Sequence, residues 1–127
     1  MEYIEKQERP WGLYYVIHDE DNYKLKRIEV NPNQRLSYQY HTKREESWTI
    51  VKGNGIVTVN DKEKKVKTGD VIKLLIGDKH RIFNSGESDL VFIEVQTGSY
   101  FGEDILKELK MIIKEYEKER NNCIRVF

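Results

Sequence analysis

The segment RLSYQYHTKREESWTIVKG, residues 35–53, carries three side chains of types that bind metals: Gln39, His41 and Glu46. Imidazole nitrogens and carboxylate or amide oxygens are common ligands of transition metals. Alternate side chains on a β-strand share a face, so Ser37, Gln39 and His41 would point together, opposite larger side chains. A polar triplet of this kind is unusual for a simple exposed strand. The three residues are either ordinary surface groups or parts of one site.

Two groups from distant segments could join such a site. His80 lies in a later strand-like run, on the same face as Ile82 and Asn84. Glu94 interrupts the apolar run LVFIEVQ, and a buried carboxylate there must be paired, ligated or shifted in pKa. A lone histidine or carboxylate in these positions is also compatible with a purely structural, hydrogen-bonded role.

Short strands must position these groups, because runs rich in β-branched and aromatic residues alternate with turn residues from Gly12 to Thr97. The clearest hairpin has a first strand from Ile56 to Val59, a turn at Asn60–Asp61 and a second strand ending near residue 66. Other expected strands lie within residues 12–19, 23–30, 35–41, 47–53, 70–78, 80–89 and 90–98. About nine or ten short strands at regular spacing predict an antiparallel sandwich or small barrel.

The last quarter of the chain changes to a helical period. One apolar stripe is formed by Ile105, Leu106, Leu109, Ile112, Ile113 and Tyr116. Acidic residues precede it and basic residues follow it, as the helix dipole favours. The pattern predicts a C-terminal helix over about residues 103–120. Its stripe could pack on the domain's own sheet or form a dimer contact.

Composition restricts the class of protein. The chain has 127 residues, 22 basic and 22 acidic, so its net charge gives no attraction to nucleic acid or an anionic membrane. Its single cysteine, Cys123, excludes a disulfide within the chain. The N-terminus has no apolar run typical of a signal peptide, and no segment has the length of a membrane span. We therefore expect a cytoplasmic protein of one domain, residues 1–127.

Two spaced motifs resemble those of the cupin superfamily. The first, G(X)5HXH(X)3–4E(X)6G, aligns with Asn33, Gln39, His41, Glu46 and Gly53. The second, G(X)5PXG(X)2H(X)3N, aligns with Gly69, Leu75, Gly77, His80 and Asn84. Asparagine, glutamine and leucine here replace a glycine, a histidine and the proline of the motifs. The resemblance implies an all-β cupin barrel, an antiparallel jelly roll, followed by the C-terminal helix.

Longer stretches resemble the C-terminal cupin domain of type II mannose-6-phosphate isomerases, a family with glutamine at the first ligand position. These stretches are RPWGLYYVI, YKLKRIEVNPNQRLSYQYH and IEVQTGSYFGED, within residues 8–104. The resemblance implies a divalent metal, zinc as the first choice, bound by Gln39, His41, Glu46 and His80. The nitrogen and oxygen donors also suit Mn, Fe, Ni or Co. In the alternative without metal, Gln39 hydrogen-bonds inside a water-filled barrel.

The same resemblance implies a sugar-phosphate isomerase that interconverts mannose 6-phosphate and fructose 6-phosphate. The metal would polarise the sugar carbonyl and stabilise the enediolate, while Glu94 moved the proton between C1 and C2. Arg44 matches an arginine of the family and is a catalytic and substrate-binding candidate, because guanidinium binds phosphate in a bidentate manner. Lys43 and Lys79 are further phosphate-binding candidates, and Arg35 and Arg81 lie nearby in sequence.

Departures from the family pattern leave other functions open. Thr42, Lys43 and Ser47 stand where family members usually have histidines. The sequence holds no guanylyltransferase domain, to which this cupin is often fused, so nucleotide transfer is not expected. The main alternative is a non-catalytic cupin that binds a sugar phosphate or nucleotide sugar, possibly as partner of a separate guanylyltransferase. A third is isomerisation or epimerisation of another nucleotide-linked sugar. By analogy with other cupins we expect a homodimer.

Overall fold

The computed structural model describes residues 1–102. Over this range the chain forms strands and turns and no helix, which confirms the predicted all-β class. The predicted helix near residues 103–120 lies outside the described residues, as does Cys123. The strands are β1 (Glu5–Arg9), β2 (Gly12–Asp19), β3 (Tyr23–Val30), β4 (Arg44–Lys52), β5 (Asn54–Val59), β6 (Lys62–Lys67), β7 (Val71–Leu74), β8 (His80–Phe83) and β9 (Leu90–Gly98).

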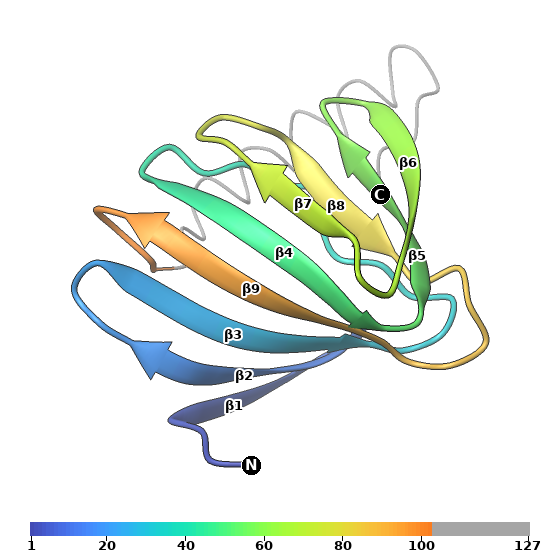
Figure 1. Cartoon of the computed structure of the whole chain (residues 1–127), viewed down its shortest axis with the longest axis horizontal. Helices are drawn as coiled ribbons and strands as arrows, with labels where there is room; N and C mark the ends of the chain where they lie inside the picture. The colour runs from blue at the N-terminus through green and yellow to red at the C-terminus, as the bar shows by residue number, and fades with distance from the viewer. Residues whose placement is uncertain (103–127) are drawn as a thin grey trace.

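The strands form two antiparallel sheets. The larger has the order β1-β2-β3-β9-β4-β7, and the smaller has the order β6-β5-β8. Figure 1 shows β2, β3, β9 and β4 side by side, with β5, β6 and β8 beyond β7. β9 therefore lies between β3 and β4, although it is the last strand in the sequence. This arrangement brings side chains from both ends of the described chain onto one interior surface.

Three predicted strands coincide with β2, β3 and β9, and the predicted hairpin is β5–β6. The backbone φ angles of Asn60 and Asp61 are 49° and 68°. Two successive positive φ values are what a tight two-residue hairpin turn requires, and asparagine and aspartate tolerate them better than most residues.

The predicted strand over residues 35–41 is not a regular strand in the structure. This segment makes only isolated bridges with β8, at Arg35 opposite Phe83 and at Gln39 opposite His80. β8 has four residues, which is too short to form a continuous ladder along the whole segment. The strand β1 was not expected, because EKQER consists only of charged and polar residues and lacks the alternation of polar and apolar residues typical of a strand. It pairs on one side only, as the edge of the larger sheet.

The interior of the barrel changes polarity along the strands. At what we call the apolar end, Ile28 and Ile50 are both paired with Phe92, and Val30 is paired with Leu90. One step along the strands, Lys26 and Trp48 are both paired with Glu94, and the next pair is Glu46 with Gln96. We call this second region, containing Lys26, Glu46 and Glu94, the polar end. The members of both ends are buried.

Several motif positions have backbone roles. Gly53 has φ 89°, and an added Cβ there would approach the Asp89 carbonyl oxygen to 2.9 Å, so glycine is required. Asn33 replaces a motif glycine and has φ 64°, a conformation that asparagine adopts more readily than most residues. Asn84 is fully buried, and its amide nitrogen donates to the carbonyls of Val30 and Ser88 at 2.8 and 2.9 Å. Thus the motifs also specify turns.

Residues 1–102 include no helix that is long and apolar enough to cross a membrane.

Candidate functional site

A cavity of about 310 Å³ opens into the polar end of the barrel. Residues from β1, β2, β3, β4, β8, β9 and the segment 35–41 line it. All four predicted metal ligands are among these residues: Gln39, His41, Glu46 and His80. The structure therefore brings together side chains that are up to 41 positions apart, from Gln39 to His80.

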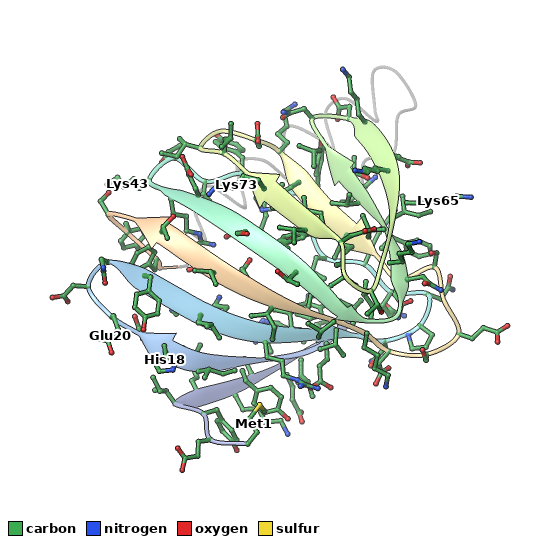
Figure 2. All side chains as sticks on the ribbon, in the orientation of Figure 1. Met1, His18, Glu20, Lys43, Lys65 and Lys73 are labelled. Carbon is green, nitrogen blue, oxygen red and sulfur yellow. The ribbon has the colours of Figure 1, made fainter. Side chains whose placement is uncertain are left out.

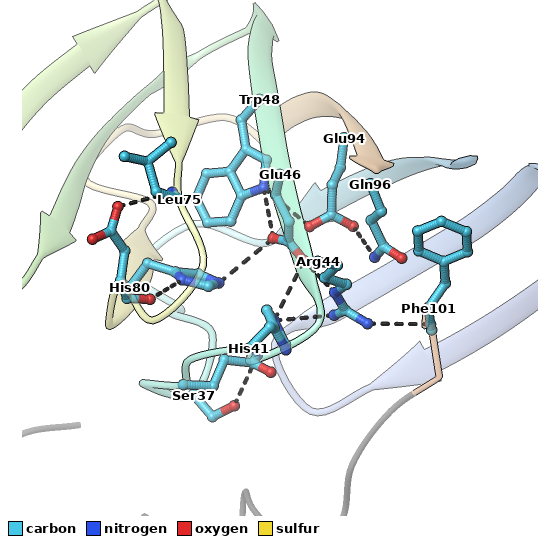
Figure 3. A network of polar contacts seen from close by, with 12 residues as sticks. Ser37, His41, Arg44, Glu46, Trp48, Leu75, His80, Glu94, Gln96 and Phe101 are labelled. Carbon is cyan, nitrogen blue, oxygen red and sulfur yellow. Dashed lines mark hydrogen bonds and ion pairs between the residues drawn. The ribbon is translucent and has the colours of Figure 1, made fainter. Parts of the chain in front are cut away.

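His41, Glu46 and His80 form a compact group whose ligand atoms all lie within 4.8 Å of one another. Glu46 Oε2 is 3.3 Å from His41 Nε2, and Glu46 Oε1 is 3.5 Å from His80 Nε2. Figure 3 shows the Glu46 carboxylate with His80 on one side and Arg44 on the other. Two imidazoles on one carboxylate are a donor set that suits a divalent transition metal.

The second nitrogen of His80 fixes its tautomer. Nδ1 is 2.9 Å from the carbonyl oxygen of Asp78, which can only accept, so Nδ1 carries the proton and Nε2 is left as the donor atom facing Glu46. Such a backbone contact is the usual outer support of a metal-binding histidine. Burial lowers the pKa of His80, which also favours the neutral form that a metal needs.

Gln39 is held beside His80 by the backbone. Its N–H donates to the His80 carbonyl at 3.1 Å, and the His80 N–H donates back at 2.8 Å. Its side-chain nitrogen is 3.4 Å from Ser37 Oγ, and its oxygen Oε1 is buried and has no hydrogen-bond partner among residues 1–102. A buried amide oxygen without a donor is energetically unfavourable, so it calls for a ligand. The residues present thus fit a metal.

Glu46 and Glu94 form a buried pair of carboxylates. The indole Nε1 of Trp48 contacts both, at 3.2 Å to Glu46 Oε1 and 3.0 Å to Glu94 Oε1, and the Gln96 amide donates to Glu94 Oε2 at 2.9 Å. Burial and the adjacent Glu94 carboxylate raise the pKa of Glu46 well above its usual range.

The partner carboxylate shifts in the opposite direction. Burial alone would raise the pKa of Glu94, but its hydrogen bond with Glu46, the nearby charges of Lys26 and Arg44, and the Gln96 amide lower it to about 2. The surroundings therefore favour the ionised form of Glu94 and the neutral form of Glu46.

Arg44 lines the cavity, but its donors contact the protein. Nε donates to Glu46 Oε2 at 2.9 Å, and Nη1 donates to the carbonyls of Phe101 and Gly102, both at 3.1 Å. Nη2 is 3.0 Å from His41 Nε2, which must act as the acceptor because guanidinium only donates. Arg44 is 4% exposed and links the histidine–glutamate group to residues 101–102.

Both predicted phosphate-binding lysines lie outside the cavity lining. Lys43 is exposed just before β4, near the outer rim in Figure 2, with its Nζ 5.8 Å from the Tyr100 ring centre. The backbone N–H of Lys79 donates to Asn60 at the hairpin turn. Arg35 is also outside the lining, whereas Arg81 is part of it. Roles for Lys43, Lys79 and Arg44 in substrate binding remain predictions.

The cavity also contains residues that the site prediction did not include: Arg9, Tyr14 and Lys26. A signal for Lys26 was present, since it has the same strand parity as Ile28 and Val30, two core residues of β3. A lysine on the core face of a strand must be paired or serve a site. Arg9 belongs to the RPWG stretch, whose Trp11 packs against the core.

Comparison with known proteins identifies the family. Residues 1–110 match the family described as mannose-6-phosphate isomerase C-terminal. The chain is 39% identical over 102 residues to alginate biosynthesis protein AlgA of Pseudomonas aeruginosa, covering 80% of this chain and 21% of that protein. It is 41% identical over 96 residues to mannose-1-phosphate guanylyltransferase ManC of Salmonella typhimurium, covering 76% and 20%. The chain thus spans about a fifth of the length of these relatives.

Solved structures agree on the fold. KdgF from a Halomonas species superposes with a TM-score of 0.70 at 13% identity, covering 77% of this chain and 94% of that one. A protein with a double-stranded β-helix domain from Klebsiella pneumoniae gives 0.66 at 21% identity, covering 69% and 77%. These likenesses support the cupin-type barrel alone. Because the family match extends over residues 1–110, this chain belongs to the family of mannose-6-phosphate isomerase C-terminal domains.

Proposed function

We propose that this chain is a metal-dependent sugar-phosphate isomerase that interconverts mannose 6-phosphate and fructose 6-phosphate. The observation that carries the proposal is the His41–Glu46–His80 group, in which Glu46 and His80 are buried, with the Gln39 oxygen that has no partner among residues 1–102 and a second buried carboxylate, Glu94, in the same cavity. A site that only stabilised the fold would not need two adjacent buried carboxylates.

The four predicted ligands would hold a divalent metal, with zinc as the first choice. When bound, the metal would polarise the sugar carbonyl and stabilise negative charge on the sugar oxygens. The chain prepares its side chains for this role, because the Asp78 carbonyl orients His80 and the His80 backbone orients Gln39. Little reorganisation is then needed on binding.

Glu94 is the proposed proton carrier. In the aldose, it would take the proton from C2 and return it to C1, while the hydroxyl proton on O2 is transferred to O1, so that atoms and electrons balance in the ketose product. Its lowered pKa keeps the carboxylate ionised, as a base must be before reaction. Trp48 and Gln96 hold its two oxygens, which fixes the orientation of the group.

Two features support a second candidate function, a non-catalytic cupin that binds a sugar phosphate or nucleotide sugar: Thr42, Lys43 and Ser47 replace histidines usual in the family, and the protein itself engages the catalytic candidate Arg44. The donors of this arginine contact Glu46, His41 and backbone carbonyls rather than facing an open cavity. The second candidate could act as partner of a separate guanylyltransferase, because this chain covers only 20% of the guanylyltransferase ManC. A homodimer is proposed by analogy with other cupins.

A coupled assay on the purified chain tests the two candidates. Metal is removed with a chelator, its removal is verified by elemental analysis, and mannose 6-phosphate is added before and after zinc or manganese is restored. The isomerase proposal predicts loss of fructose 6-phosphate formation and its recovery with metal. Full activity in the metal-free sample contradicts the mechanism, and binding without turnover in the metal-loaded sample supports the second candidate.

A further inference from the structure

Three residues that line the cavity lie on β1, β2 and β3, which β9 separates from β4, the strand of the proposed metal ligand Glu46. They are Arg9 on β1, Tyr14 on β2 and Lys26 on β3, which we call the Tyr14 corner. Tyr14 is diagonal to both of the others in the strand register, since Gln7 and Ile28 are its direct partners. Diagonal neighbours of this kind are within reach of long side chains.

Both cations of the Tyr14 corner contact the same aromatic ring. Lys26 Nζ is 4.5 Å from the Tyr14 ring centre, and Arg9 Cζ is 5.4 Å from it, with Arg9 Nη2 3.4 Å from the Tyr14 hydroxyl. The ring offers each cation a favourable electrostatic contact. The ring therefore holds two basic side chains at one corner of the cavity.

The cavity has an excess of positive charge, although the chain as a whole is neutral. Four basic side chains of residues 1–102 line it, Arg9, Lys26, Arg44 and Arg81, against the carboxylates of Glu46 and Glu94. A bound divalent metal would increase this excess. Lys26 is 4% exposed and lies directly opposite Glu94 in the register of β3 and β9, and the three arginines still outnumber the remaining carboxylate, Glu46. The cavity is therefore electrostatically suited to an anionic ligand.

The order of the strands gives the anion a position. β9 lies between β3 and β4, and neighbouring strands are about 4.8 Å apart, so Lys26 and Glu46 are on strands separated by about 10 Å. Glu94 on β9 is the direct neighbour of Lys26 on one side and of Trp48 on the other. A linear ligand across these strands would have one end at the metal ligands, its middle at Glu94 and its other end at Lys26.

We propose that the Tyr14 corner binds the phosphate group of the sugar phosphate, with Lys26 as the main anchor and Arg9 at the rim. The inference rests on the proposed function, and it adds a subsite and a basis for specificity. An open-chain hexose 6-phosphate has its reacting carbons and its phosphate at opposite ends of a six-carbon chain. The corner therefore selects phosphorylated over neutral sugars and places C1 and C2 near Glu94 and the metal ligands.

The test is calorimetric titration of the metal-loaded 127-residue chain with three probes: mannose 6-phosphate, inorganic phosphate and mannose. Lys26→Gln and Arg9→Gln each remove one cation, and the matched controls are Lys64→Gln and Lys65→Gln, which remove exposed lysines of β6 outside the cavity lining. We expect each cavity variant to weaken binding of the two phosphate probes by about 10- to 100-fold, the range for losing a hydrogen bond to a charged group. The affinity of the cavity variants for mannose should change little, and so should the affinity of the two control variants for the phosphate probes. Lys26→Arg, which keeps a positive charge, should bind the phosphate probes more tightly than Lys26→Gln.

The inference is overturned if wild-type protein binds neither phosphate probe, if both cavity variants bind them like wild type, or if the controls lose as much affinity. Arg9 is exposed, so Arg9→Gln carries the test should Lys26→Gln fail to fold. Binding and turnover separate the two proposals. Phosphate binding that depends on Lys26 without isomerisation contradicts only the isomerase, whereas isomerisation with an unchanged KM in both variants contradicts only the subsite.

Discussion

The two ends of the barrel interior are built on the same three strands and have opposite chemistry. Val30, Ile50 and Phe92 at the apolar end are at most 1% exposed, and Lys26, Glu46 and Glu94 at the polar end are 2–5% exposed. Burial of apolar surface stabilises the fold at the first end. Burial of charges at the second end is unfavourable unless each charge is paired. The comparison indicates that the apolar end maintains the structure and the polar end maintains a function.

The apolar end should show the largest effect on stability. Phe92 is fully buried and its ring centre is 4.6 Å from that of Trp48, so Phe92→Ala leaves a cavity beneath the site. We expect a loss of about 3–5 kcal/mol in the free energy of unfolding, measured by urea denaturation of the metal-free chain. Val71→Ala, at a side chain 64% exposed, is the control and should change stability by less than about 0.5 kcal/mol. A loss below about 1 kcal/mol for Phe92→Ala would contradict this division of roles.

The polar end should show the converse, a large effect on metal binding with a small effect on the fold. His80→Ala removes a proposed ligand, and we expect metal affinity to fall by at least about 100-fold. Loss of a residue that only hydrogen-bonds to a ligand can already lower metal affinity by up to about 100-fold. His18→Ala is the matched control, because His18 is exposed on β2 and outside the cavity. Metal content and affinity are measured by elemental analysis and competition with a chelator. Equal metal binding by the two variants would show that the His41–Glu46–His80 group is not the site.

The difference between the ends also explains what the sequence could predict. Apolar and β-branched runs gave β2, β3 and β9 with correct bounds, because strand formation follows from local alternation. Motif spacing predicted the convergence of Gln39, His41, Glu46 and His80 in one cavity, because turns at Asn33, Gly53 and Gly77 have the required positive φ values.

Other features depend on pairing and side-chain contacts that no local pattern contains. The segment 35–41 is not a regular strand, because its only described neighbour there, β8, is short. The engagement of Arg44 with carbonyls of residues 101 and 102 connects positions 57 and 58 apart in the sequence. The Tyr14 corner likewise requires the register of three strands, which the sequence does not specify directly.

The pH dependence of stability gives a smaller test at the polar end. Because the pKa of Glu46 is raised in the folded state, its contribution to stability is fully present below its ordinary value of 4.5 and is lost as pH rises through the raised pKa. Glu46→Gln cannot ionise, so the metal-free variant should lose less stability than wild type as pH increases from 4.5 to neutrality. Glu94 acts in a separate window, since its lowered pKa affects stability between 4.5 and about 2.

Unfolding free energies of metal-free wild type and Glu46→Gln, measured from pH 4.5 upward, check this expectation. The variant should also fail to retain metal, so that one substitution favours the fold and removes the proposed function. If the unfolding free energies of the two proteins change with pH in parallel, the fold does not disfavour the ionised form of Glu46. The contrast between the two ends would then be weaker than the burial suggests.

The smallest expected effect compares two neighbouring residues, Tyr38 and Gln39, on opposite faces of the segment 35–41. The Tyr38 hydroxyl donates to Asp61 Oδ1 at 2.8 Å and accepts from the Asp61 N–H at 2.9 Å, which ties the segment to the β5–β6 turn. Tyr38→Phe should reduce stability by about 1 kcal/mol, because Asp61 is exposed and water can replace the lost partner. In Tyr38→Phe the metal affinity should change only slightly, whereas Gln39→Leu should lower metal affinity and leave stability nearly unchanged.

The contribution of Tyr38 to stability also depends on pH. Burial and the hydrogen bond to Asp61 raise the pKa of Tyr38 to about 12, so this contribution is present below pH 10 and is lost as pH rises through 12. Denaturation of both variants at pH 8 and above 10 measures this difference. If Tyr38→Phe weakens metal binding as much as Gln39→Leu does, the two faces of the segment are not separate in function.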